Sequence, residues 1–590
     1  MKSKTLKRFY EIGKPHIKHF ILIILFSIIV NLLAASRPIL VKNTIDEFIQ
    51  NKVLIREISI LGKNHIISID IIGFLYLDIL LIENFLNFWV MKHTSIVGEK
   101  ILSQTRQKIF DFSQKSNIKF HDKTPSGKIF SRITGDTEDL AIFFEDVLIT
   151  LFQDISYIIV ISVIMFVLNW KLSLIVYGIV IICVIITYIF TKKANIAYNL
   201  AKDARTKLYT FLSEVIYGAK TIKIFNIQKI INKEEKDIAE DHLSKVVKTS
   251  LYEAPLAQII FLFMYIAISI VIAISAKNLF HINIAIGEIY IFITYIRELF
   301  DPITRTLENI EGVQEAVVSL NKIYDILDEE QYIEDFSSGK ELKEIKGKLE
   351  FKNVWFKYNE NDENWVLKDI SFCIEPTETI ALVGKTGAGK TTIINLVNRF
   401  YEIQKGEILL DGINIKDINL NYLRKHIGNV LQDPFIYSGT IEENIGLYNN
   451  LDKQQINDAI DYASARDFID SLPNGINEMA IERGENFSIG QKQLIAFARI
   501  FALNPDIFIL DEATANIDTS TERLIQKSID KLSKEKTAIF IAHRLSTIVN
   551  VDKILVLKDG EIIEQGSHKQ LLEKNGYYSK LYNSYYESLG

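Results

Sequence analysis

Cysteine is nearly absent from this chain, which has two, Cys183 and Cys373, among 590 residues. Two cysteines cannot form a disulfide framework or a cysteine-rich metal cluster, so neither device can stabilise the fold. Cys183 falls in a long apolar run and Cys373 in a strand-like one. We therefore expect both side chains to be buried and unreactive.

The chain also lacks an excess of positive charge. Its 67 Lys and Arg residues are outnumbered by 73 Asp and Glu residues, which gives a formal net charge of −6. This balance argues against a nucleic-acid partner, because nucleic-acid-binding surfaces are basic. The chain is too long for a single hydrophobic core. Long apolar runs fill its first half and charged, turn-rich sequence fills its second, so at least two domains are expected.

A cleavable signal sequence is not expected. The basic segment Met1–Phe20 precedes an apolar run that is too long for the core of a signal peptide, and no A-x-A cleavage site follows it. We expect the run to be retained as a membrane-spanning helix. Six such helices are predicted in the lipid bilayer, at residues 19–41, 66–92, 140–168, 171–192, 254–276 and 284–305.

Basic residues between the predicted spans indicate their orientation. Residues 92–132 include nine Lys or Arg residues and residues 192–248 are similarly rich, whereas the two short connections on the opposite side contain one each. Cytoplasmic loops are enriched in basic residues, so both long segments and the N-terminus are expected in the cytoplasm. Their length indicates helices that continue beyond the bilayer as rods, with turn-like breaks at 121–127 and 217–220.

Several ionisable residues fall inside predicted spans: Arg37, Asp70, Asp78, Glu83, Asp154 and Arg297. Each costs about 2.5–3.5 kcal/mol at mid-bilayer on insertion scales, so most should face the bundle interior or water. Asp70 and Asp78 lie within about 80° of each other on a helical wheel. They either form an acidic face that accepts cationic substrates, or they pair with other helices or lie near the interface. We favour the second interpretation.

A glycine-rich stretch in the second half fits the P-loop pattern. An apolar strand-like run at 379–383 precedes it and a helix-like run at 393–397 follows it, which is the context that phosphate binding requires. Backbone N–H groups of the loop approach phosphate oxygens, Lys390 reaches the β- and γ-phosphates of ATP, and Thr391 holds Mg²⁺. The predicted loop residues are Gly384, Lys385, Thr386, Gly387, Ala388, Gly389, Lys390, Thr391 and Thr392.

Two later strand-like runs end in residues suited to ATP hydrolysis. The run 507–510 is followed by Asp511, which suits Mg²⁺ binding, and by Glu512, which is placed to polarise an attacking water. A further run, 537–541, leads to His543 as a candidate γ-phosphate sensor, although a lone histidine is more often structural.

Between these elements, residues 486–493 (Asn-Phe-Ser-Ile-Gly-Gln-Lys-Gln) resemble the LSGGQ signature of ATP-binding cassette (ABC) proteins, which other P-loop ATPases lack. Segments similar to the family's Q-, X-, D- and H-loops occur in the family order, at 430–434, 482–484, 515–518 and 543–546. The resemblance implies that Tyr358 stacks on adenine, that Gln432 joins the catalytic and Mg²⁺-binding set, and that ATP contacts the signature. The implied signature contacts are Ser488, Gly490 and Gln491.

The whole chain resembles a bacterial ABC exporter half-transporter. This implies an all-α six-helix transmembrane domain (1–320), a linker (321–348) and an α/β P-loop ABC ATPase domain (349–590). The resemblance also implies ATP-driven export of an amphiphilic, lipid-like or drug-like substrate across the cytoplasmic (inner) membrane. Two chains would sandwich ATP between the P-loop of one and the signature of the other. Segments near Phe120 and Gly218 look like the family's coupling helices, which transmit closure of the dimer.

The signature departs from the family pattern at the first of its two glycine positions, which is Ile489, and at Phe487, where leucine is usual. A β-branched side chain obstructs the approach of backbone to γ-phosphate. Ala515 replaces a common serine in the D-loop, a milder change. Because the catalytic set of this chain is otherwise intact, we expect a heterodimer with a different half-transporter that has a sound signature. A homodimer with slow turnover is the alternative.

Two other classes of function share this architecture: a fused ABC importer, and a non-pumping ABC membrane regulator or channel. Glu512 and His543 argue against the regulator, because they are useful only for hydrolysis. The identity of the substrate is not encoded in any motif of the chain.

Overall fold

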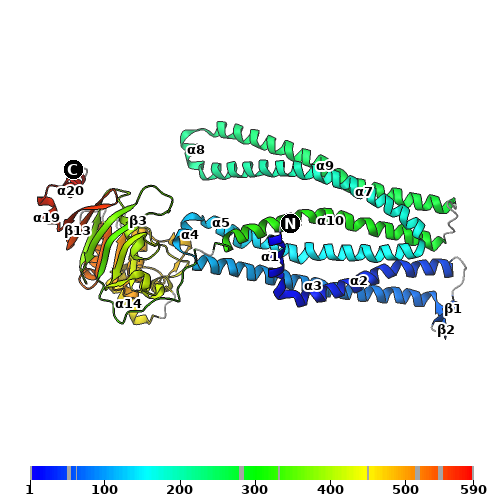
Figure 1. Ribbon diagram of the computed structural model, residues 1–590, viewed down its shortest axis with the longest axis horizontal. Helices are drawn as coiled ribbons and strands as arrows, with labels where there is room; N and C mark the ends of the chain where they lie inside the picture. The colour runs from blue at the N-terminus through cyan, green and yellow to red at the C-terminus, as the bar shows by residue number, and fades with distance from the viewer. Residues whose placement is uncertain are drawn as a thin grey trace. The chain divides into compact units, whose positions relative to one another are not determined.

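The computed structural model divides the chain into two compact units (Figure 1). The first contains residues 1–114 and 125–330, and the second contains residues 115–124 and 331–590. Each unit has hydrophobic clusters of its own. The residues that the structure describes are 3–49, 55–60, 63–277, 285–329, 332–447, 451–511, 519–541 and 549–587.

Long helices form the first unit, as its apolar runs predict. The predicted spans fall mainly in α2 (Ile17–Thr44), α3 (Ile69–Lys115), α7 (Leu148–Tyr217), α9 (Gln228–Ala276) and α10 (Ile286–Leu327). The shorter elements are α1 (Ser3–Gly13), η1 (Lys14–His16), η2 (Ile45–Ile49), β1 (Ile55–Ile60), β2 (Lys63–Ser68), α5 (Ser126–Ser131), η3 (Arg132–Asp136), α6 (Thr137–Ile142), η4 (Phe143–Val147) and α8 (Ala219–Phe225). Among the described residues, three helical stretches are long and apolar enough to cross a membrane by length and composition: Lys4–Glu47, Ser126–Tyr217 and Gln228–Ala276.

Helix α7 contains two of the predicted spans, joined by a sharp turn at Asn169. The backbone of Asn169 is not helical, with φ −156° and ψ 97°. Its side chain accepts a hydrogen bond from the backbone N–H of Leu172 at 3.2 Å, which begins the second half as an N-cap residue does. The rings of Phe166 and Tyr177 stack across the turn with centroids 5.4 Å apart. The chain reverses direction here, as predicted for 169–171 (Figure 1).

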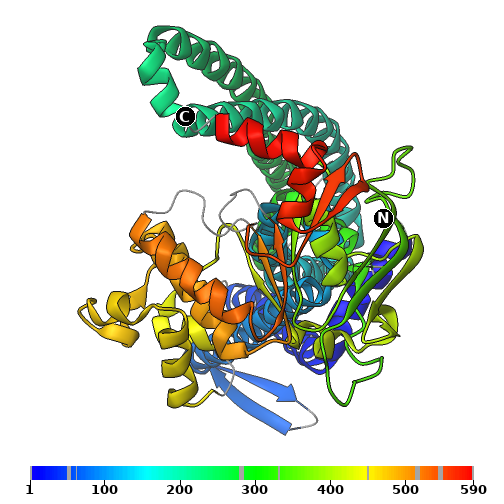
Figure 2. The ribbon, with the colours of Figure 1, turned by 90° about the vertical axis from the view of Figure 1, so that its left-hand side faces the viewer.

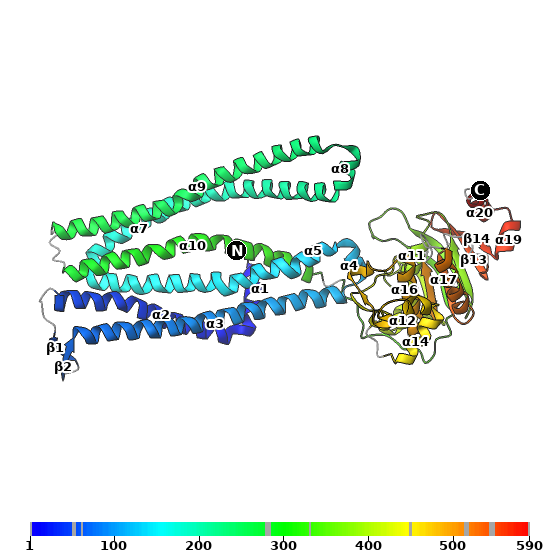
Figure 3. The same cartoon turned by 180° about the vertical axis from the view of Figure 1, so that it is seen from behind.

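The rods predicted beyond the spans are also present. Helix α7 continues to Tyr217, well past the end of its second span at residue 192, and α9 begins at Gln228, well before its span at residue 254. Helix α8 joins them after Gly218, and α7 and α9 lie side by side in two views (Figures 1 and 3). The turn-like sequence at 217–220 therefore marks a real reversal of the chain.

Ionisable residues in the predicted spans pair between helices. Nη2 of Arg305 in α10 donates to Oδ1 of Asp154 in α7 at 2.6 Å, and Asp154 is 4% exposed. Nε of Arg37 in α2 lies 3.3 Å from Oε2 of Glu83 in α3. Arg37, Glu83 and Asp154 therefore face neighbouring helices, in agreement with the expectation that most ionisable residues in the spans face the bundle interior or water. The other three predicted residues have exposed side chains: Asp70, Asp78 and Arg297.

The second unit is an α/β domain, as predicted. Its largest sheet has the strand order β14-β13-β5-β12-β11-β8, and a second, antiparallel sheet has the order β4-β3-β6-β7. The strands are β3 (Leu349–Phe356), β4 (Leu367–Ile374), β5 (Thr379–Val383), β6 (Lys405–Leu410), β7 (Ile413–Asn414), β8 (Ile427–Val430), β9 (Gly439–Thr440), β10 (Met479–Ala480), β11 (Ile507–Asp511), β12 (Thr537–Ile541), β13 (Lys553–Lys558) and β14 (Glu561–Gly566). The helices are α4 (Ile118–Lys123), α11 (Lys390–Val397), η7 (Ile415–Asp417), α12 (Leu420–Lys425), α13 (Ile441–Gly446), α14 (Lys453–Tyr462), α15 (Arg466–Asp470), η8 (Gly475–Asn477), η9 (Glu482–Gly484), α16 (Ile489–Leu503), α17 (Thr519–Leu532), α19 (His568–Glu573) and α20 (Tyr577–Glu587).

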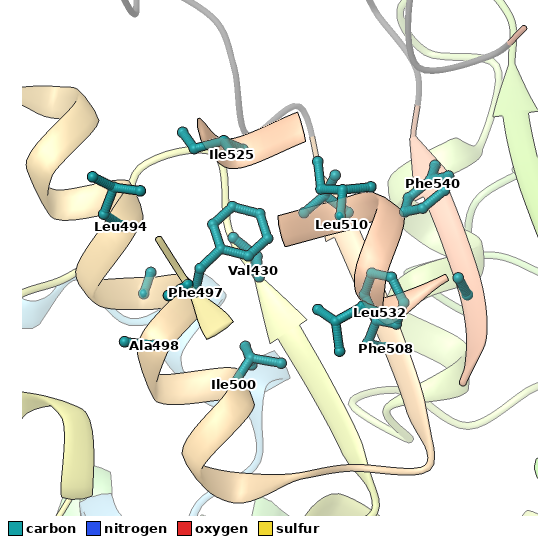
Figure 4. Packing of buried hydrophobic residues seen from close by; sticks show 14 of the residues in the cluster. Val430, Leu494, Phe497, Ala498, Ile500, Phe508, Leu510, Ile525, Leu532 and Phe540 are labelled. Carbon is teal, nitrogen blue, oxygen red and sulfur yellow. The ribbon is translucent and has the colours of Figure 1, made fainter. Parts of the chain in front are cut away.

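Strands β5, β11 and β12 of the large sheet are buried on both faces, which explains their nearly continuous apolar sequence. Phe508 of β11 packs in one cluster with Phe497 of α16, while the neighbouring Ile507 packs in another with Leu396 of α11. Figure 4 shows the first cluster, with Phe497 lying beside Val430 of β8. Helix α17, orange in Figure 2, covers the same face as α16. The sheet is thereby held between α16 and α17 on one side and α11 on the other.

The expectation for the two cysteines is confirmed for one and wrong for the other. Cys183 is fully buried in the helical cluster of the first unit. Cys373 is half-buried in β4, where successive side chains alternate between the core and the surface. Its thiol lies 3.3 Å from a carboxylate oxygen of Glu375. Burial, followed by that carboxylate, raises the pKa of Cys373, so the thiol stays protonated and unreactive.

Candidate functional site

The predicted nucleotide residues follow strands that end at one edge of the large sheet. Strands β8, β11, β12 and β5 are parallel neighbours, so their carboxyl ends lie together. The P-loop follows β5, Asp511 is the last residue of β11, and Gln432 follows β8. In open α/β sheets, ligands bind outside the carboxyl ends of the strands. The order of the strands therefore brings three separate sequence motifs to one binding edge.

Glycines shape the P-loop because side chains would not fit there. A Cβ atom on Gly384 would lie 2.4 Å from the carbonyl oxygen of Leu557. Gly389 has φ +103°, a left-handed backbone that favours glycine, and a Cβ atom there would lie 2.5 Å from Leu367. The intervening residues Lys385, Thr386 and Gly387 are exposed. The loop thus presents its backbone outward in front of the N-terminus of α11.

The lysine and the two threonines that end the motif have different surroundings. Nζ of Lys390 donates to the carbonyl oxygens of Gly384 at 2.7 Å and of Lys385 at 3.2 Å. Thr391 is exposed, whereas Thr392 is buried and its hydroxyl lies 3.1 Å from that of Tyr358. Only Thr391 therefore presents its hydroxyl at the surface. Thr392 joins the loop to the strand that carries the predicted adenine-stacking tyrosine.

Tyr358 belongs to an aromatic cluster at the end of β3. Its ring meets those of Phe356 and Tyr401 edge-on, at centroid distances of 4.9 and 5.0 Å. The hydroxyl of Tyr401 donates to the carboxylate of Asp122, in the segment 115–124 of the second unit. Burial, and then this carboxylate, raise the pKa of Tyr401. The predicted adenine-stacking residue is thereby held in a packed cluster, which limits the freedom of its ring.

The signature segment begins helix α16. Ser488 is the N-cap residue, and its hydroxyl accepts from the backbone N–H of Gln491 at 3.2 Å. The Gln491 side chain accepts in return from the backbone N–H of Ser488 at 2.9 Å, which completes a capping box. Gly490 is buried, whereas Ile489 is 48% exposed. The unusual isoleucine thus projects from the start of the helix rather than into the core.

Phe487, the other departure, has a structural role. It is buried in the cluster beneath α16 and meets the ring of Phe468 edge-on at 5.9 Å. Phenylalanine at position 487 therefore remains buried where the family usually has a leucine. Of the two unusual residues, only Ile489 alters the surface that the signature presents.

Gln493 is a functional candidate that the sequence analysis missed. It lies one turn into α16, is 1% exposed, and its Nε2 donates to the backbone carbonyl of Gln432 at 2.9 Å. The signature helix is thereby linked to the Q-loop of the same chain. A buried amide in an otherwise apolar helix face is the sequence signal that points to such a link. In the sequence, Gln493 is the second of the two glutamines in the signature-like segment 486–493.

Part of the predicted site lies outside the described residues. Glu512, His543 and the D-loop-like segment 515–518 fall in the ranges 512–518 and 542–548. Asp511, immediately before the first of these ranges, is half-buried at the end of β11. The chemistry of the described donors fits Mg²⁺ and ATP: the hydroxyl of Thr391, the carboxylate of Asp511 and the amide oxygen of Gln432 are the oxygen ligands that Mg²⁺ accepts.

Similarity to known proteins covers both units. Residues 20–303 match the ABC transporter transmembrane region, and residues 367–515 match the ABC transporter ATPase family. The chain is 30% identical over 585 residues to YgaD of Bacillus subtilis (strain 168), named as a multidrug export ATP-binding/permease protein, and the match covers 98% of this chain and 99% of YgaD. The chain belongs to the ABC transporter family. As an ABC transporter with an ATPase domain, it couples ATP hydrolysis to transport.

Other relatives have the same arrangement. The ABC transporter is 37% identical over 491 residues to the ABC transporter ATP-binding protein exp8 of Streptococcus pneumoniae serotype 4, across 82% of this chain and 83% of exp8. Its fold matches that of a bacterial Atm1-family ABC exporter solved with ATP bound, with a TM-score of 0.77. That match covers 97% of this chain and 98% of the other at 24% identity. The expected fold, a helical transmembrane domain followed by an ABC ATPase domain, is therefore confirmed.

A cavity of the transporter lies among α7, α9 and α10 in the first unit. It has a volume of about 530 Å³ and mixes polar with apolar side chains. Amides, an aromatic ring, three acidic and two basic side chains all contribute to its wall. These residues include Asn195, Tyr198, Asn199, Glu253, Gln314 and Lys322. A wall of this composition suits a molecule with both polar and apolar parts.

Proposed function

We propose that this ABC transporter exports an amphiphilic, lipid-like or drug-like compound from the cytoplasm. The proposal rests mainly on the fusion, in one chain, of a transmembrane region with an ATPase domain. Two relatives named as multidrug export proteins, from Bacillus subtilis and Staphylococcus aureus, match it over 98% of its length. The mixed wall of the cavity among α7, α9 and α10 favours an amphiphilic molecule.

In the proposed ATP site, Lys390 exchanges its contacts with loop carbonyls for the β- and γ-phosphates. The exposed hydroxyl of Thr391, the carboxylate of Asp511 and the amide of Gln432 hold Mg²⁺, which neutralises charge on the phosphates. The loop backbone from Gly384 binds phosphate oxygens, and the ring of Tyr358 stacks on adenine. Each of these roles follows from the family pattern and from the surroundings of the side chain.

Hydrolysis is proposed to depend on two residues outside the described ranges. Glu512 polarises the attacking water and His543 contacts the γ-phosphate. Ser488, Gly490 and Gln491 serve the other side of the sandwich, where they face the ATP of a second chain. Each complete site therefore needs two chains.

The second chain is proposed to be a different half-transporter. Ile489 is 48% exposed at the start of α16, so it projects where a partner's ATP would approach. In a homodimer both sites would contain this side chain, whereas in a heterodimer only one would. Glu512 of this chain would then act against a sound signature of the partner. The partner should have a complete signature, and we expect it to lack the catalytic glutamate.

The proposed location is the cytoplasmic membrane, with the N-terminus and the ATPase domain in the cytoplasm. The basic residues of segments 92–132 and 192–248 support this orientation. The proposed domain limits are 1–320 for the transmembrane domain, 321–348 for the linker and 349–590 for the ATPase domain. Helix α10 extends from the first of these ranges into the second and ends at Leu327.

One experiment tests the direction of transport, the coupling of ATPase activity to transport, and the need for a different partner chain. The chain is purified alone and with any exporter half encoded beside it, and both samples are reconstituted in vesicles with ATP supplied on the ATPase-domain side. Accumulation of a fluorescent amphiphile on the opposite side, only with the pair, supports heterodimeric export. Accumulation on the same side as ATP indicates an importer, and ATPase without any movement indicates a regulator. Transport by the lone chain at the rate of the pair would contradict the heterodimer.

A further inference from the structure

An apolar groove lies between the N-terminal helix and the start of the first predicted span. Its volume is about 410 Å³, and it is defined by α1, η1, α2, η4 and the beginning of α7. One of its fourteen lining residues carries a charge, and six are aromatic. The lining residues are Leu6, Phe9, Tyr10, Gly13, Lys14, Ile17, Phe20, Ile23, Ile24, Phe143, Phe144, Leu148, Ile149 and Phe152. We call this surface the N-terminal groove.

The floor of the groove is a built aromatic cluster. Phe9 lies with its ring centroid 4.8 Å from that of Phe143 and 5.9 Å from that of Phe144, and Phe20 lies 6.1 Å from Phe144. A Cβ atom on Gly13 would be in van der Waals contact with both rings, 3.4 Å from Phe144 and 3.6 Å from Phe20. A side chain longer than a methyl group at this position would therefore enter the space beside these rings.

The groove lies at the predicted boundary between membrane and water. Its upper part is α1, which precedes the span at 19–41, and its lower part includes Ile24 within that span. A ring nitrogen of His19 lies 3.1 Å from one of His93, just past the end of the span at 66–92. Lys92 lies over the ring of Trp89 at 4.5 Å, an arrangement typical of the interface. The groove thus extends from the headgroup level toward the acyl chains.

Positive charge near the groove favours a ligand with an anionic group. Lys14 lines the groove and Lys18 follows it after four residues, and both side chains are exposed. Within the described part of the chain, neither has an ion-pair partner, whereas Lys4 is paired with Asp328. An apolar slot below two unpaired ammonium groups complements a molecule with an acyl chain below an anionic head.

We propose that the N-terminal groove binds one acyl chain of an anionic phospholipid whose phosphate lies against Lys14 and Lys18. The chain lies along Phe20 and Phe144 and reaches the level of Ile24. This lipid is a resident ligand of the membrane domain and not a transported substrate. The site is independent of the proposed export and of the identity of the second chain.

The test uses tryptophan quenching by lipids with brominated acyl chains. Ile24 is 39% exposed in the groove and becomes the reporter as Ile24→Trp, with the wild-type chain and its four tryptophans as background. The full-length protein is reconstituted in vesicles of brominated phosphatidylglycerol diluted with unbrominated phosphatidylcholine, and in the converse mixture. The mole fraction of brominated lipid that gives half-maximal quenching should be at least about threefold lower for phosphatidylglycerol than for phosphatidylcholine. Two basic side chains near a membrane surface attract an anionic headgroup strongly enough for a difference of about this size.

Three variants, each made in the Ile24→Trp chain, assign that preference. Replacing Lys14 and Lys18 by Gln should remove it, whereas the matched pair Lys4→Gln and Lys7→Gln should retain it, because those lysines already lie against Asp328 and Glu11. Gly13→Leu places a side chain between the aromatic rings, so quenching by both lipids should fall.

A reporter away from the groove supplies the last control. Phe85 is 62% exposed in the span at 66–92 and does not line the groove, so Phe85→Trp should be quenched equally by both lipids. The proposal would be overturned if both lipids gave half-maximal quenching of the Ile24→Trp protein at the same mole fraction. It would also be overturned if the preference for the anionic lipid survived the loss of Lys14 and Lys18. Quenching of the Phe85→Trp protein without any quenching of the Ile24→Trp protein would show that protein, and not lipid, covers the groove.

Discussion

The P-loop and the signature helix of this domain differ in how closely they follow the family pattern. At the P-loop every glycine that the turn requires is present, and Lys390 and Thr391 stand at the start of α11. At the signature the capping box of Ser488 and Gln491 is intact, but Ile489 projects from the helix. We call the P-loop the sound end and the signature the impaired end of the domain. In the proposed dimer these two ends belong to different ATP sites. From this difference we infer that one chain carries a sound half of one proposed site and an impaired half of the other.

The largest expected effect breaks the sound end. Glu512→Gln removes the group that we propose to polarise water, while the proposed contacts of the nucleotide with Lys390 and the loop backbone remain. We expect ATP binding to persist and steady-state ATPase to fall by at least about 100-fold, within the range of general base catalysis. Binding of a fluorescent ATP analogue and phosphate release, both in the complete transporter, measure the two quantities. ATPase within twofold of the wild type would remove Glu512 from the catalytic role.

The sound end was the easier to predict from the sequence. The P-loop pattern is local: a five-residue apolar strand, a turn that excludes side chains and a helix, all within 379–397. The buried strands β5, β11 and β12 were equally recognisable, because both of their faces are apolar. The parallel order of these strands then brings Asp511 to the same edge as the P-loop.

Other features required the tertiary fold. The link from Gln493 to the carbonyl of Gln432 joins residues 61 apart in sequence, so the helix pattern can mark Gln493 as a buried amide but cannot identify its partner. The different surroundings of Thr391 and Thr392 also depend on the fold: the turn of the helix exposes Thr391, the predicted Mg²⁺ ligand, and buries Thr392 against Tyr358. Arg305 was missed as the partner of Asp154, because it lies at the very end of a predicted span.

A change outside both ends should separate hydrolysis from transport. Phe120 in α4 is 1% exposed, and its ring lies 6.0 Å from that of Tyr332 within the second unit. Phe120→Ala removes a buried ring that positions α4, at a cost of about 3–5 kcal/mol for a typical buried phenylalanine. We expect basal ATPase within about twofold and transport reduced about tenfold, because α4 resembles a coupling helix and supplies no ATP-binding group.

The control for this variant is Phe130→Ala, since Phe130 is 68% exposed in α5 and its loss creates no cavity. Both activities are measured in the same vesicles. Equal retention of ATPase and transport in the Phe120→Ala protein would count against a coupling role for α4. A parallel loss in both variants would instead indicate a general effect of shortening aromatic side chains in this region.

Repair of the impaired end sharpens the comparison. Ile489→Gly removes the β-branched side chain from the start of α16. In a heterodimer whose partner lacks the catalytic glutamate, this repair should tighten ATP binding at the slow site about tenfold and change ATPase by less than about twofold, because that site still lacks the group that activates water. In a homodimer every repaired site contains Glu512, and ATPase should rise severalfold. Ile489→Val, which keeps the branch, serves as the control for both measurements.

The smallest expected effect concerns the part of the signature that is intact. Ser488→Ala removes the N-cap hydroxyl of α16, and such a loss costs about 0.5–2 kcal/mol of stability. The nucleotide-free ATPase unit should therefore unfold about 2–4 °C lower per kcal/mol lost, measured by thermal unfolding of the full-length protein in detergent.

Ser567 provides a matched control, because it forms the same capping box with Gln570 at α19. Ser567→Ala should lower the unfolding temperature similarly but leave the ATP affinity of the slow site unchanged, whereas Ser488→Ala should lower both. Ser488→Asp separates the two roles: aspartate is an equally good N-cap and preserves stability, but its charge repels the γ-phosphate, so ATP binding at the slow site weakens only if the signature faces ATP. An unchanged ATP affinity of that site in the Ser488→Asp protein would place the signature away from any phosphate.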